Sequence, residues 1–335
     1  MDREQAAFAA QCEPHRRALR VHCYRMVGSS DEAEDLVQET FLRAWRSRAT
    51  FEGRAQLSTW LHRIATNACL DALARRPRRV LPQDVVPAVR PTDEPRATPP
   101  LRPELPWLQP FPDALLDAPA PGEAQPEALV AARETIELAF LAAVQHLEPR
   151  PRAILILCDV LGWSAKETAG LLELTVPAVT SALQRAHATM RTLVPTGRDG
   201  WTPAAPPSDD ERAVLAAYMA AWERHDASEL TRLLRDDARW AMPPAALWFD
   251  GRSAIERLFT EFPMDFHGHF RMVATAANRQ PAAATYMRPH GQTEFRFSGI
   301  QVLRIERGQI AEITSFSAAL CRTFELPMIF SEPPV

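Results

Sequence analysis

Two sets of side chains in this sequence have the types and spacing that binding to nucleic acid needs. In the first, Trp60, Arg63 and Asn67 fall on one face of a helix that we expect to begin near Ser58. Aromatic and amide groups capture unstacked bases, and neighbouring arginines attract phosphates. The sequence therefore predicts a mixed polar and aromatic face with the chemistry to bind unstacked bases, with hydrophobic core packing as the alternative for Trp60. The residues expected on phosphates are Arg54, Arg75 and Arg76.

The second set lies on two predicted helices joined by a very short turn. Ser164 and Glu167 form a capping pair that begins the first helix, and Thr175 caps the next. Apolar residues recur at helical spacing on the inner side of the second helix, a pattern typical of a helix-turn-helix. The second helix of such a motif enters the major groove of DNA. A purely structural helix pair is the alternative. The residues expected at the DNA are Pro177, Thr180, Ser181, Gln184 and Arg185.

A third group of residues predicts a protein-binding helix. Ser29 and Glu32 form a capping pair, and apolar residues follow at helical spacing with acidic residues on the other side. An acidic amphipathic helix suits a basic protein surface. A solvated charged face is the alternative. The residues expected to contact such a partner are Asp31, Glu34, Asp35, Gln38 and Phe41.

These motifs belong to a chain that is too long for a single hydrophobic core. Its 335 residues favour two or three domains. Thirteen of the 30 prolines fall between Leu81 and Pro126, which predicts a linker because proline has no amide donor. Trp107 and Phe111 lie inside this linker, and we expect them to dock on a neighbouring domain, since a solvated linker has little reason to expose both. A second linker is predicted at residues 195–207.

Composition and charge narrow the class of protein. The sequence has 46% hydrophobic residues, 24% charged residues and a net charge of -4. Residues 1–80 nevertheless carry 14 arginines against 10 acids, so binding to a polyanion must be local. The five cysteines form no CxxC pair, and neither disulfides nor a metal site is expected. No apolar run approaches the length of a membrane span, and the charged N-terminus predicts a cytoplasmic chain without a membrane partner.

The last block, residues 208–335, changes period. Two capped helices come first, at Ser208 and Asp226, and short strands separated by Gly, Pro and Asn then dominate. A helix from Ser253 to Phe262 interrupts the strands. This pattern predicts an α+β domain in which a curved antiparallel sheet wraps around helices.

The run from Asp31 to Trp45 resembles the polymerase-binding helix of sigma-70 factors of the extracytoplasmic-function type. Residues 51–67 are similar to the promoter-melting and minus-ten-reading segment of that family, and residues 164–191 to its minus-thirty-five reader. The resemblance covers residues 10–194. It identifies the basic partner of the acidic helix as the clamp coiled coil of RNA polymerase core. At Thr180 and Ala182, where many relatives carry Lys and Arg, the sequence departs from the pattern, which predicts weaker attraction to phosphate.

Residues 208–335 resemble the SnoaL-like cone-shaped barrel of polyketide cyclases and ketosteroid isomerases, which is also appended to one branch of these sigma factors. Such barrels enclose an apolar pocket, so a small apolar ligand is expected there. Core packing is the alternative for each lining residue. Asp265, His267 and His269 form only a weak acid–base or metal pattern, so neither catalysis nor a metal or other cofactor is expected. The expected lining residues are Trp222, Trp240, Trp248, His267 and Tyr286.

The predicted fold is multidomain, with two all-α sigma-factor domains, the second containing the helix-turn-helix, followed by the α+β cone. The predicted ranges are region 2 at 5–79, a Pro-rich linker at 80–126, region 4 at 127–194, a linker at 195–207 and the SnoaL-like domain at 208–335.

We expect an alternative RNA polymerase sigma factor that is not an enzyme. It would bind polymerase core and promoter DNA, and its C-terminal domain would regulate it in cis by touching the linker around Trp107. One rival is a helix-turn-helix regulator fused to a SnoaL-like cyclase or isomerase. Another is a helix-turn-helix activator that never replaces a sigma factor.

Overall fold

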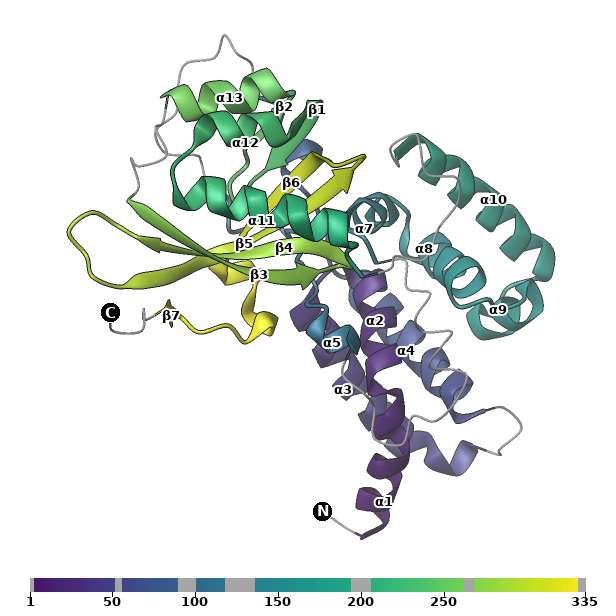
Figure 1. Ribbon diagram of the computed structural model, residues 1–335. Helices are drawn as coiled ribbons and strands as arrows, with labels where there is room; N and C mark the ends of the chain where they lie inside the picture. The colour runs from purple at the N-terminus through teal and green to yellow at the C-terminus, as the bar shows by residue number, and fades with distance from the viewer. Residues whose placement is uncertain are drawn as a thin grey trace. The chain divides into compact units, whose positions relative to one another are not determined.

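The computed structural model describes residues 3–51, 56–89, 101–117, 136–193, 206–261 and 268–330. They form two compact units (Figure 1). The helical unit joins Met1–Arg79 with Ala114–Ala205, and the C-terminal unit joins Val80–Asp113 with Pro206–Val335. The predicted Pro-rich linker is therefore divided, and its first part belongs to the C-terminal unit. None of the helices in the described ranges combines the length and the apolar character that crossing a membrane requires.

The first part of the helical unit packs three long helices around one core. Apolar residues of α2, α3 and α4 are fully buried, as at Leu19, Val37 and Leu61. The Ser29 hydroxyl accepts a hydrogen bond from the Glu32 amide at 3.2 Å, which caps α3 as predicted. The helices are α1 (Arg3–Cys12), α2 (Arg16–Val27), α3 (Ser30–Ser47) and α4 (Leu57–Leu73).

The second part of the helical unit contains the predicted helix-turn-helix. The Ser164 and Glu167 capping box begins α9, and Thr175 caps α10 through the Ala178 amide. Among the apolar residues of α10, Val176 is 42% exposed, whereas Ala182 is buried. Val176 is the first residue of its helix, where no preceding turn covers it. The helices are α5 (Ala114–Asp117), α7 (Leu138–Gln145), α8 (Pro149–Leu155) with a π turn at Ile156–Val160, α9 (Ala165–Leu172) and α10 (Val176–Leu193).

A buried arginine joins the two parts of the helical unit. Arg152 on α8 is 1% exposed, and its guanidinium donates to the carbonyl of Met26 at the end of α2. It also donates to the Gln145 side-chain and backbone oxygens at 2.7 and 2.9 Å and to the Leu147 carbonyl at 2.9 Å. These acceptors are all neutral. Burial without a bonded carboxylate lowers the pKa of Arg152 to about 10.

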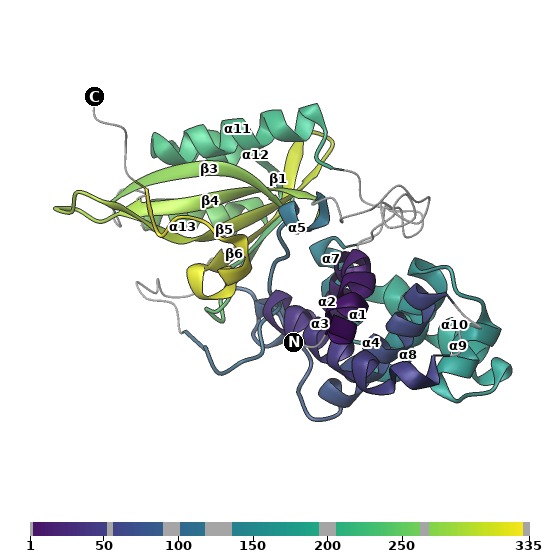
Figure 2. The same ribbon diagram turned by 90° about the horizontal axis from the view of Figure 1, so that it is seen from below.

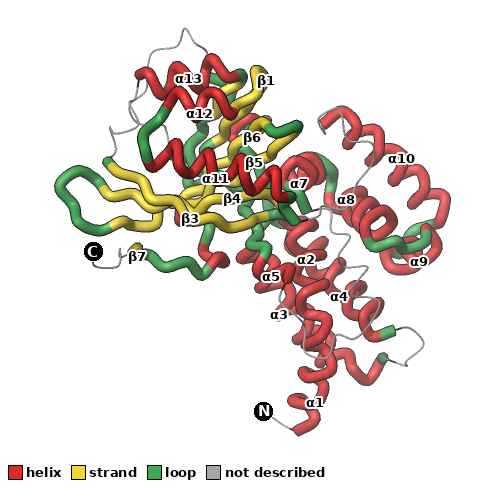
Figure 3. The backbone as a smooth tube through the Cα atoms, viewed as in Figure 1, coloured by secondary structure: helices red, strands yellow, loops and turns green. Residues whose placement is uncertain are grey.

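The C-terminal unit is a mixed sheet that curves around helices. Its strand order is β2-β1-β6-β5-β4-β3, with β7 paired to β5, and every named strand lies in this unit (Figure 3). The sequence predicted an antiparallel sheet. The observed sheet is mixed, because β1 pairs parallel to β6. The strands are β1 (Leu234–Ala241), β2 (Trp248–Asp250), β3 (His269–Ala277), β4 (Gln280–Arg288), β5 (Phe295–Glu306), β6 (Gln309–Ser317) and β7 (Ile329–Phe330).

Three helices cover one face of this sheet and fill the cone. The first of them, α11 (Asp209–Glu223), lies across β3 and β4, as Figure 2 shows. The others are α12 (Ala227–Leu233) and α13 (Arg252–Glu261), which pack near β1. Their apolar faces share one core with Trp240, Leu303 and Ile313 of the sheet. Burial of the apolar face of α12, rather than its intrinsic helix propensity, stabilises this short helix.

The first part of the predicted linker, Val80–Asp113, is named the strap here, and its described residues dock on the C-terminal unit. Trp107 is 2% exposed and packs with Val80 and Ala246. At one end the Val89 amide donates to the Trp248 carbonyl at 2.9 Å, beside strand β2. The expectation that Trp107 docks on a neighbouring domain is confirmed.

The other end of the strap is fixed at the turn between β3 and β4. The Phe111 amide donates to Asn278 Oδ1 at 2.8 Å, and the Asn278 amide donates to the Phe111 carbonyl at 2.9 Å. The Arg279 amide donates to Asp113 Oδ1 at 2.8 Å, and the two side chains, 7% and 6% exposed, form an ion pair at 3.7 Å. Phe111 is fully buried, so the Phe111 prediction is also confirmed.

Candidate nucleic-acid interface

The predicted base-capturing face lies along one side of α4. Arg63 and Asn67 are exposed, and Arg75 and Arg76 are exposed just beyond the end of the helix. Trp60 is half-buried and packs against Phe51, with ring centroids 5.0 Å apart. The structure thus brings four of the predicted polar residues to the surface beside an aromatic ring. Arg54, predicted on phosphate, lies outside the described residues.

One of these cations is already engaged within the unit. Arg76 forms an ion pair with Glu32, and Arg79 pairs with the same carboxylate at 2.6 Å. Glu32 therefore closes the turn after α4 instead of completing the predicted capping box at Ser29. Arg76 is 55% exposed, so this pair is weak and solvent-screened.

The predicted recognition residues form an exposed stripe on α10. Buried residues of α10, Val179, Ala186 and Met190, pack on the other side and fix the helix against α8 and α9. The Thr180 hydroxyl donates to the Val176 carbonyl at 3.1 Å. The residues predicted at the DNA are all exposed: Pro177, Thr180, Ser181, Gln184 and Arg185.

The acidic helix α3 separates the predicted partner-binding residues into two groups. Asp35 and Gln38 are exposed, and Asp31 is half-buried. Glu34 instead pairs with Arg16 of α2 at 2.9 Å, and the Arg16 guanidinium lies 5.0 Å from the centre of the Phe41 ring. Glu34 and Phe41 are therefore partly covered by α2, and the acidic character of the exposed surface depends mainly on Asp35.

Sequence reasoning missed Leu42 on this surface. Leu42 is 49% exposed, which is unusual for a large apolar side chain on a helix with a buried face. It lies one turn beyond Gln38 and two turns beyond Asp35, so the three residues share one stripe. A helical projection that includes apolar residues on the acidic side finds it.

A cleft of about 620 Å³ lies between α4 and α9 in the helical unit. One wall carries residues predicted to capture bases, Trp60 and Arg63. The other wall adds an aromatic ring and a cation that the sequence reasoning did not single out, Trp163 and Lys166. No sequence signal could have paired the walls, because they are about a hundred residues apart. The remaining lining residues are Thr59, Ser164, Glu167, Gly170 and Leu171.

The cone brings together two of the predicted pocket residues. Trp222 and Trp240 are 8% and 4% exposed, with ring centroids 6.0 Å apart, and both contact Phe259. The Tyr218 hydroxyl beside them donates to Gln301 Oε1 at 2.5 Å. Burial raises the pKa of Tyr218. These rings pack on one another as part of the core.

The other predicted lining residues lie elsewhere. Trp248 is half-buried and donates from Nε1 to the Val86 carbonyl of the strap at 2.9 Å. Tyr286 is buried against Phe297 and Phe330, outside the aromatic core of the cone. His267 and Asp265 lie outside the described residues. Within the ranges that are described, no group of three His, Cys, Asp or Glu residues has a geometry that holds a metal ion.

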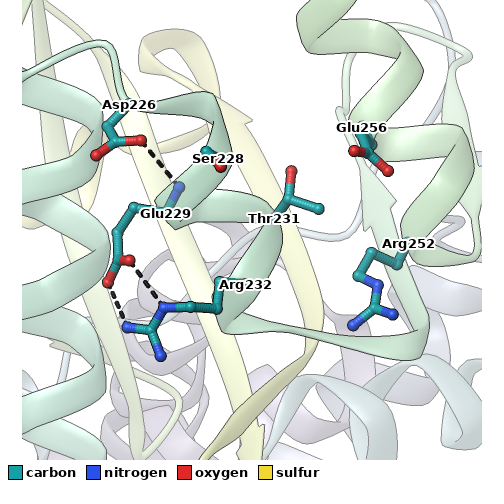
Figure 4. Close-up of a pocket in the computed structure, with 7 residues that line it drawn as sticks. All are labelled: Asp226, Ser228, Glu229, Thr231, Arg232, Arg252 and Glu256. Atoms are coloured by element: carbon teal, nitrogen blue, oxygen red, sulfur yellow. Dashed lines mark hydrogen bonds and ion pairs between the residues drawn. The ribbon is translucent and has the colours of Figure 1, made fainter.

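A second cleft, of about 440 Å³, lies between α12 and α13 (Figure 4). Its charged groups other than Glu256 already have partners. Arg232 binds both carboxylate oxygens of Glu229 at 2.8 and 2.6 Å, and Arg252 pairs with Asp236 at 2.5 Å. Asp226 caps α12 through the Glu229 amide at 2.9 Å. This cleft therefore offers less unpaired charge than the cleft between α4 and α9.

Family models match three parts of the chain. A model described as Sigma-70 region 2 matches residues 12–79, and one described as Sigma-70, region 4 matches residues 137–190. A SnoaL-like domain model matches residues 215–313. The two sigma-70 matches fall on the two parts of the helical unit, and the third falls on the cone.

Similar proteins extend over most of the chain. The ECF RNA polymerase sigma factor SigG of Mycobacterium tuberculosis is 42% identical over 328 residues, which cover 97% of this chain and 85% of SigG. The ECF RNA polymerase sigma factor SigE of Mycolicibacterium smegmatis is 33% identical over 201 residues, or 56% of this chain and 63% of SigE. The crystal structure of the M. tuberculosis sigma factor SigJ covers 94% of this chain and 98% of its own, with a TM-score of 0.61 at 18% identity. That last likeness concerns the fold alone.

Proposed function

This chain belongs to the extracytoplasmic-function sigma factors of the sigma-70 family, and from that premise we propose that its C-terminal unit controls transcription initiation in cis through the strap. The chain is an alternative RNA polymerase sigma factor with a C-terminal SnoaL-like domain. The observation that carries the proposal is the docking of Val80–Asp113, which connects region 2 to the rest of the chain, on the C-terminal unit.

The partners and the residues that bind them form the first part of the proposal. The exposed stripe of α3, with Asp35, Gln38 and Leu42, binds the basic clamp coiled coil of polymerase core. Trp60, Arg63 and Asn67 of α4 hold the opened strand, and α10 reads the minus-thirty-five element. Support comes from the exposure of these residues, apart from the half-buried Trp60, and from their chemistry, since aromatic and amide groups stack on and pair with bases.

Promoter reading requires the two DNA-binding blocks to separate. The minus-ten and minus-thirty-five elements are about 25 base pairs apart, or roughly 85 Å along the duplex. In the helical unit α4 and α9 line one cleft, and only nine residues separate Leu171 in that cleft from Thr180 on the recognition helix. Nine residues span at most about 32 Å. The compact form of the helical unit therefore precedes promoter binding.

The strap sets how far the blocks can separate. The chain between region 2 and region 4 runs from Val80 to Thr135, and docking holds the described residues of its first part, 80–89 and 101–113. A released strap of 34 residues can extend to roughly 110 Å. A docked strap therefore restrains separation of the blocks, and a released strap permits it.

Variants that release the strap test this proposal. Trp107→Ala empties the small core between strap and cone, and Asp113→Ala removes the anchor at Arg279. We expect each variant to raise promoter-specific run-off transcription with purified core polymerase about threefold or more. The reason is that loss of docking shifts the population from the restrained form to the form with a released strap. The control is Glu104→Ala, an exposed strap residue that pairs only locally with Arg102. Output from Trp107→Ala and Asp113→Ala that matches the wild type, or falls below it, contradicts restraint by the strap.

We also propose that the C-terminal unit performs no bond chemistry. Support comes from the described centre of the cone, where Trp222, Trp240 and Phe259 fill the space. Two of its polar groups are bonded within the unit: the Tyr218 hydroxyl donates to Gln301 Oε1, and Trp240 Nε1 donates to Ser315 Oγ at 2.8 Å. A small apolar ligand in this cone remains a prediction, and native mass spectrometry of the full chain tests it.

A further inference from the structure

The cleft between α4 and α9 combines aromatic rings with cations that have no ion-pair partner among the described residues. Two indoles, of Trp60 and Trp163, and two cations, of Arg63 and Lys166, line the same space of about 620 Å³. Both indoles are half-buried and both cations are exposed. Neither cation forms an ion pair with any residue in the described part of the chain. The volume lies within the range of pockets that hold small ligands, roughly 300–1,000 Å³.

The charge of the cleft is effectively positive. Its acidic member, Glu167, accepts hydrogen bonds from the Ser164 amide at 2.8 Å and the Ser164 hydroxyl at 2.6 Å. These bonds hold the pKa of Glu167 below its usual value, so it remains a carboxylate committed to capping α9. Arg63 and Lys166 are left to attract an anion. A flat ring stacks on indole, and base–aromatic stacking contributes about 1–3 kcal/mol per base.

We propose that this cleft binds a free nucleotide, a flat base with its phosphate, and that the bound nucleotide holds the two DNA-binding blocks together. A ligand that touches both walls stabilises the form in which α4 and α9 are adjacent, by mass action. This second part rests on the proposed function, in which the blocks separate to reach two promoter elements. A single DNA strand offers the same base and phosphate, so the test includes both sources.

Gly170 supplies a variant that fills the cleft without disturbing the fold. It lies on α9 within the lining, and no atom approaches within 4 Å of the place where its Cβ would lie. Gly170→Met extends a side chain into the cleft, whereas Gly170→Ala makes the same backbone change without filling it. Both substitutions favour the helix, so loss of α9 cannot account for a loss of binding.

Fluorescence anisotropy of the full chain with N-methylanthraniloyl-labelled ATP and GTP measures binding directly. Unlabelled ATP, GTP and AMP compete in one arm, and a thymidine trinucleotide competes in the other. We expect saturable binding that is about tenfold weaker or more in Gly170→Met and in Lys166→Gln, because each change costs a stacking or charge contact. Gly170→Ala and Arg150→Gln, an exposed cation on α8, should bind as the wild type does.

Several results would overturn the proposal. Wild-type affinity in Gly170→Met contradicts the site, as does the absence of saturable binding by both probes. Stronger competition by the trinucleotide than by free nucleotides contradicts a free ligand. Hydrogen exchange tests the second part: ATP should slow amide exchange in α4 and α9 of Gly170→Ala, and unchanged exchange at saturation contradicts the holding role. The assays contain neither polymerase nor promoter, so their failure leaves control through the strap untouched.

Discussion

The helical unit and the C-terminal unit hold their buried polar groups in different ways. In the helical unit, Arg152 is buried among neutral oxygens, and His22 and His62 are buried beside each other with ring centroids 5.5 Å apart. In the C-terminal unit, the buried cation Arg279 has the Asp113 carboxylate as its partner. Arg152, His22 and His62 are thus buried without a bonded carboxylate in the helical unit, whereas Arg279 of the C-terminal unit faces one.

This difference bears on what each unit has to do. A buried charge without an opposite charge costs more to keep than one that is paired and hydrogen-bonded. The joint at Arg152 therefore holds region 2 and region 4 together through directional bonds, with no ion pair to add to them. The anchor at Asp113 combines both kinds of interaction. We infer that the helical unit is the part built to open, and that the strap stays docked unless something competes for it.

Among the variants that test this contrast, removal of the Arg152 guanidinium should change stability the most. Arg152→Ala leaves the carbonyls of Met26 and Leu147 and the Gln145 side chain without their donor in a buried site. We expect a loss of about 3 kcal/mol or more in the stability of the helical unit. Amide hydrogen exchange in α2 and α8 measures this loss within the full chain.

The matched control for Arg152 is Arg185→Ala, which removes an exposed arginine from the same unit. Its effect should stay within about 0.5 kcal/mol. Exchange in the strands of the C-terminal unit should not change in either variant. If Arg152→Ala behaves like Arg185→Ala, the joint between the two blocks does not depend on this residue, and the contrast between the units fails.

Disruption of the strap anchor should have a smaller effect, confined to the C-terminal unit. Asp113→Ala removes the acceptor of the Arg279 amide and the carboxylate that faces its guanidinium. Asp113→Asn keeps an acceptor and loses only the charge. We expect about 2 kcal/mol for the alanine variant and about half of that for asparagine, since each retained bond contributes roughly 1 kcal/mol. Proteolysis of the strap reports its release, and equal rates in both variants would show that the hydrogen bond adds nothing.

Acidification should weaken the helical unit and spare the C-terminal unit. Burial lowers the pKa of His22 well below its usual 6.5, and His62 and Arg25 nearby add to this. Burial also lowers the pKa of His62, although its bond to the Ser58 carbonyl at 2.9 Å opposes the shift. The unfolded chain takes up these protons as pH falls through 6.5, and the folded unit resists them. Stability is therefore full above pH 6.5 and falls below it, by up to about 1.4 kcal/mol per pH unit for each histidine.

Hydrogen exchange at pH 7 and pH 5, corrected for the intrinsic rates, checks this dependence in both units at once. His62→Gln should reduce the slope in the helical unit by up to half. The described histidines of the C-terminal unit, His225, His269 and His290, are half-buried or exposed, so its strands should keep their protection. An equal slope in the two units would show that net charge, not these buried rings, controls the response to acid.

The sequence predicted what depends on local chemistry and period. Capping residues such as Ser164 and Ser208 begin their helices as expected, and the helix-turn-helix stripe from Thr180 to Arg185 is exposed. The docking of Trp107 followed from its chemistry alone. What could not be predicted depends on contacts between distant segments: the strap turn at Asn278, the acceptors of Arg152, and the cleft that pairs Trp60 with Trp163. Local spacing carries no information about these pairs.

Substitutions at the two ends of α9 should have the smallest effect on stability. They test whether backbone conformation alone controls stability there. Glu173 closes α9 with a φ of 55°, in the left-handed region where glycine is favoured. Glu173→Gly relieves this conformation, and we expect a gain of about 0.5–1 kcal/mol in stability.

Gly162 offers the opposite change, because its φ is 70° and no atom lies within 4 Å of the place that a Cβ would take. Gly162→Ala should therefore cost about 1 kcal/mol through backbone strain alone. Exchange rates in α9 and α10 report both variants, and shifts of the same sign would show that backbone conformation does not govern stability at the two ends of α9.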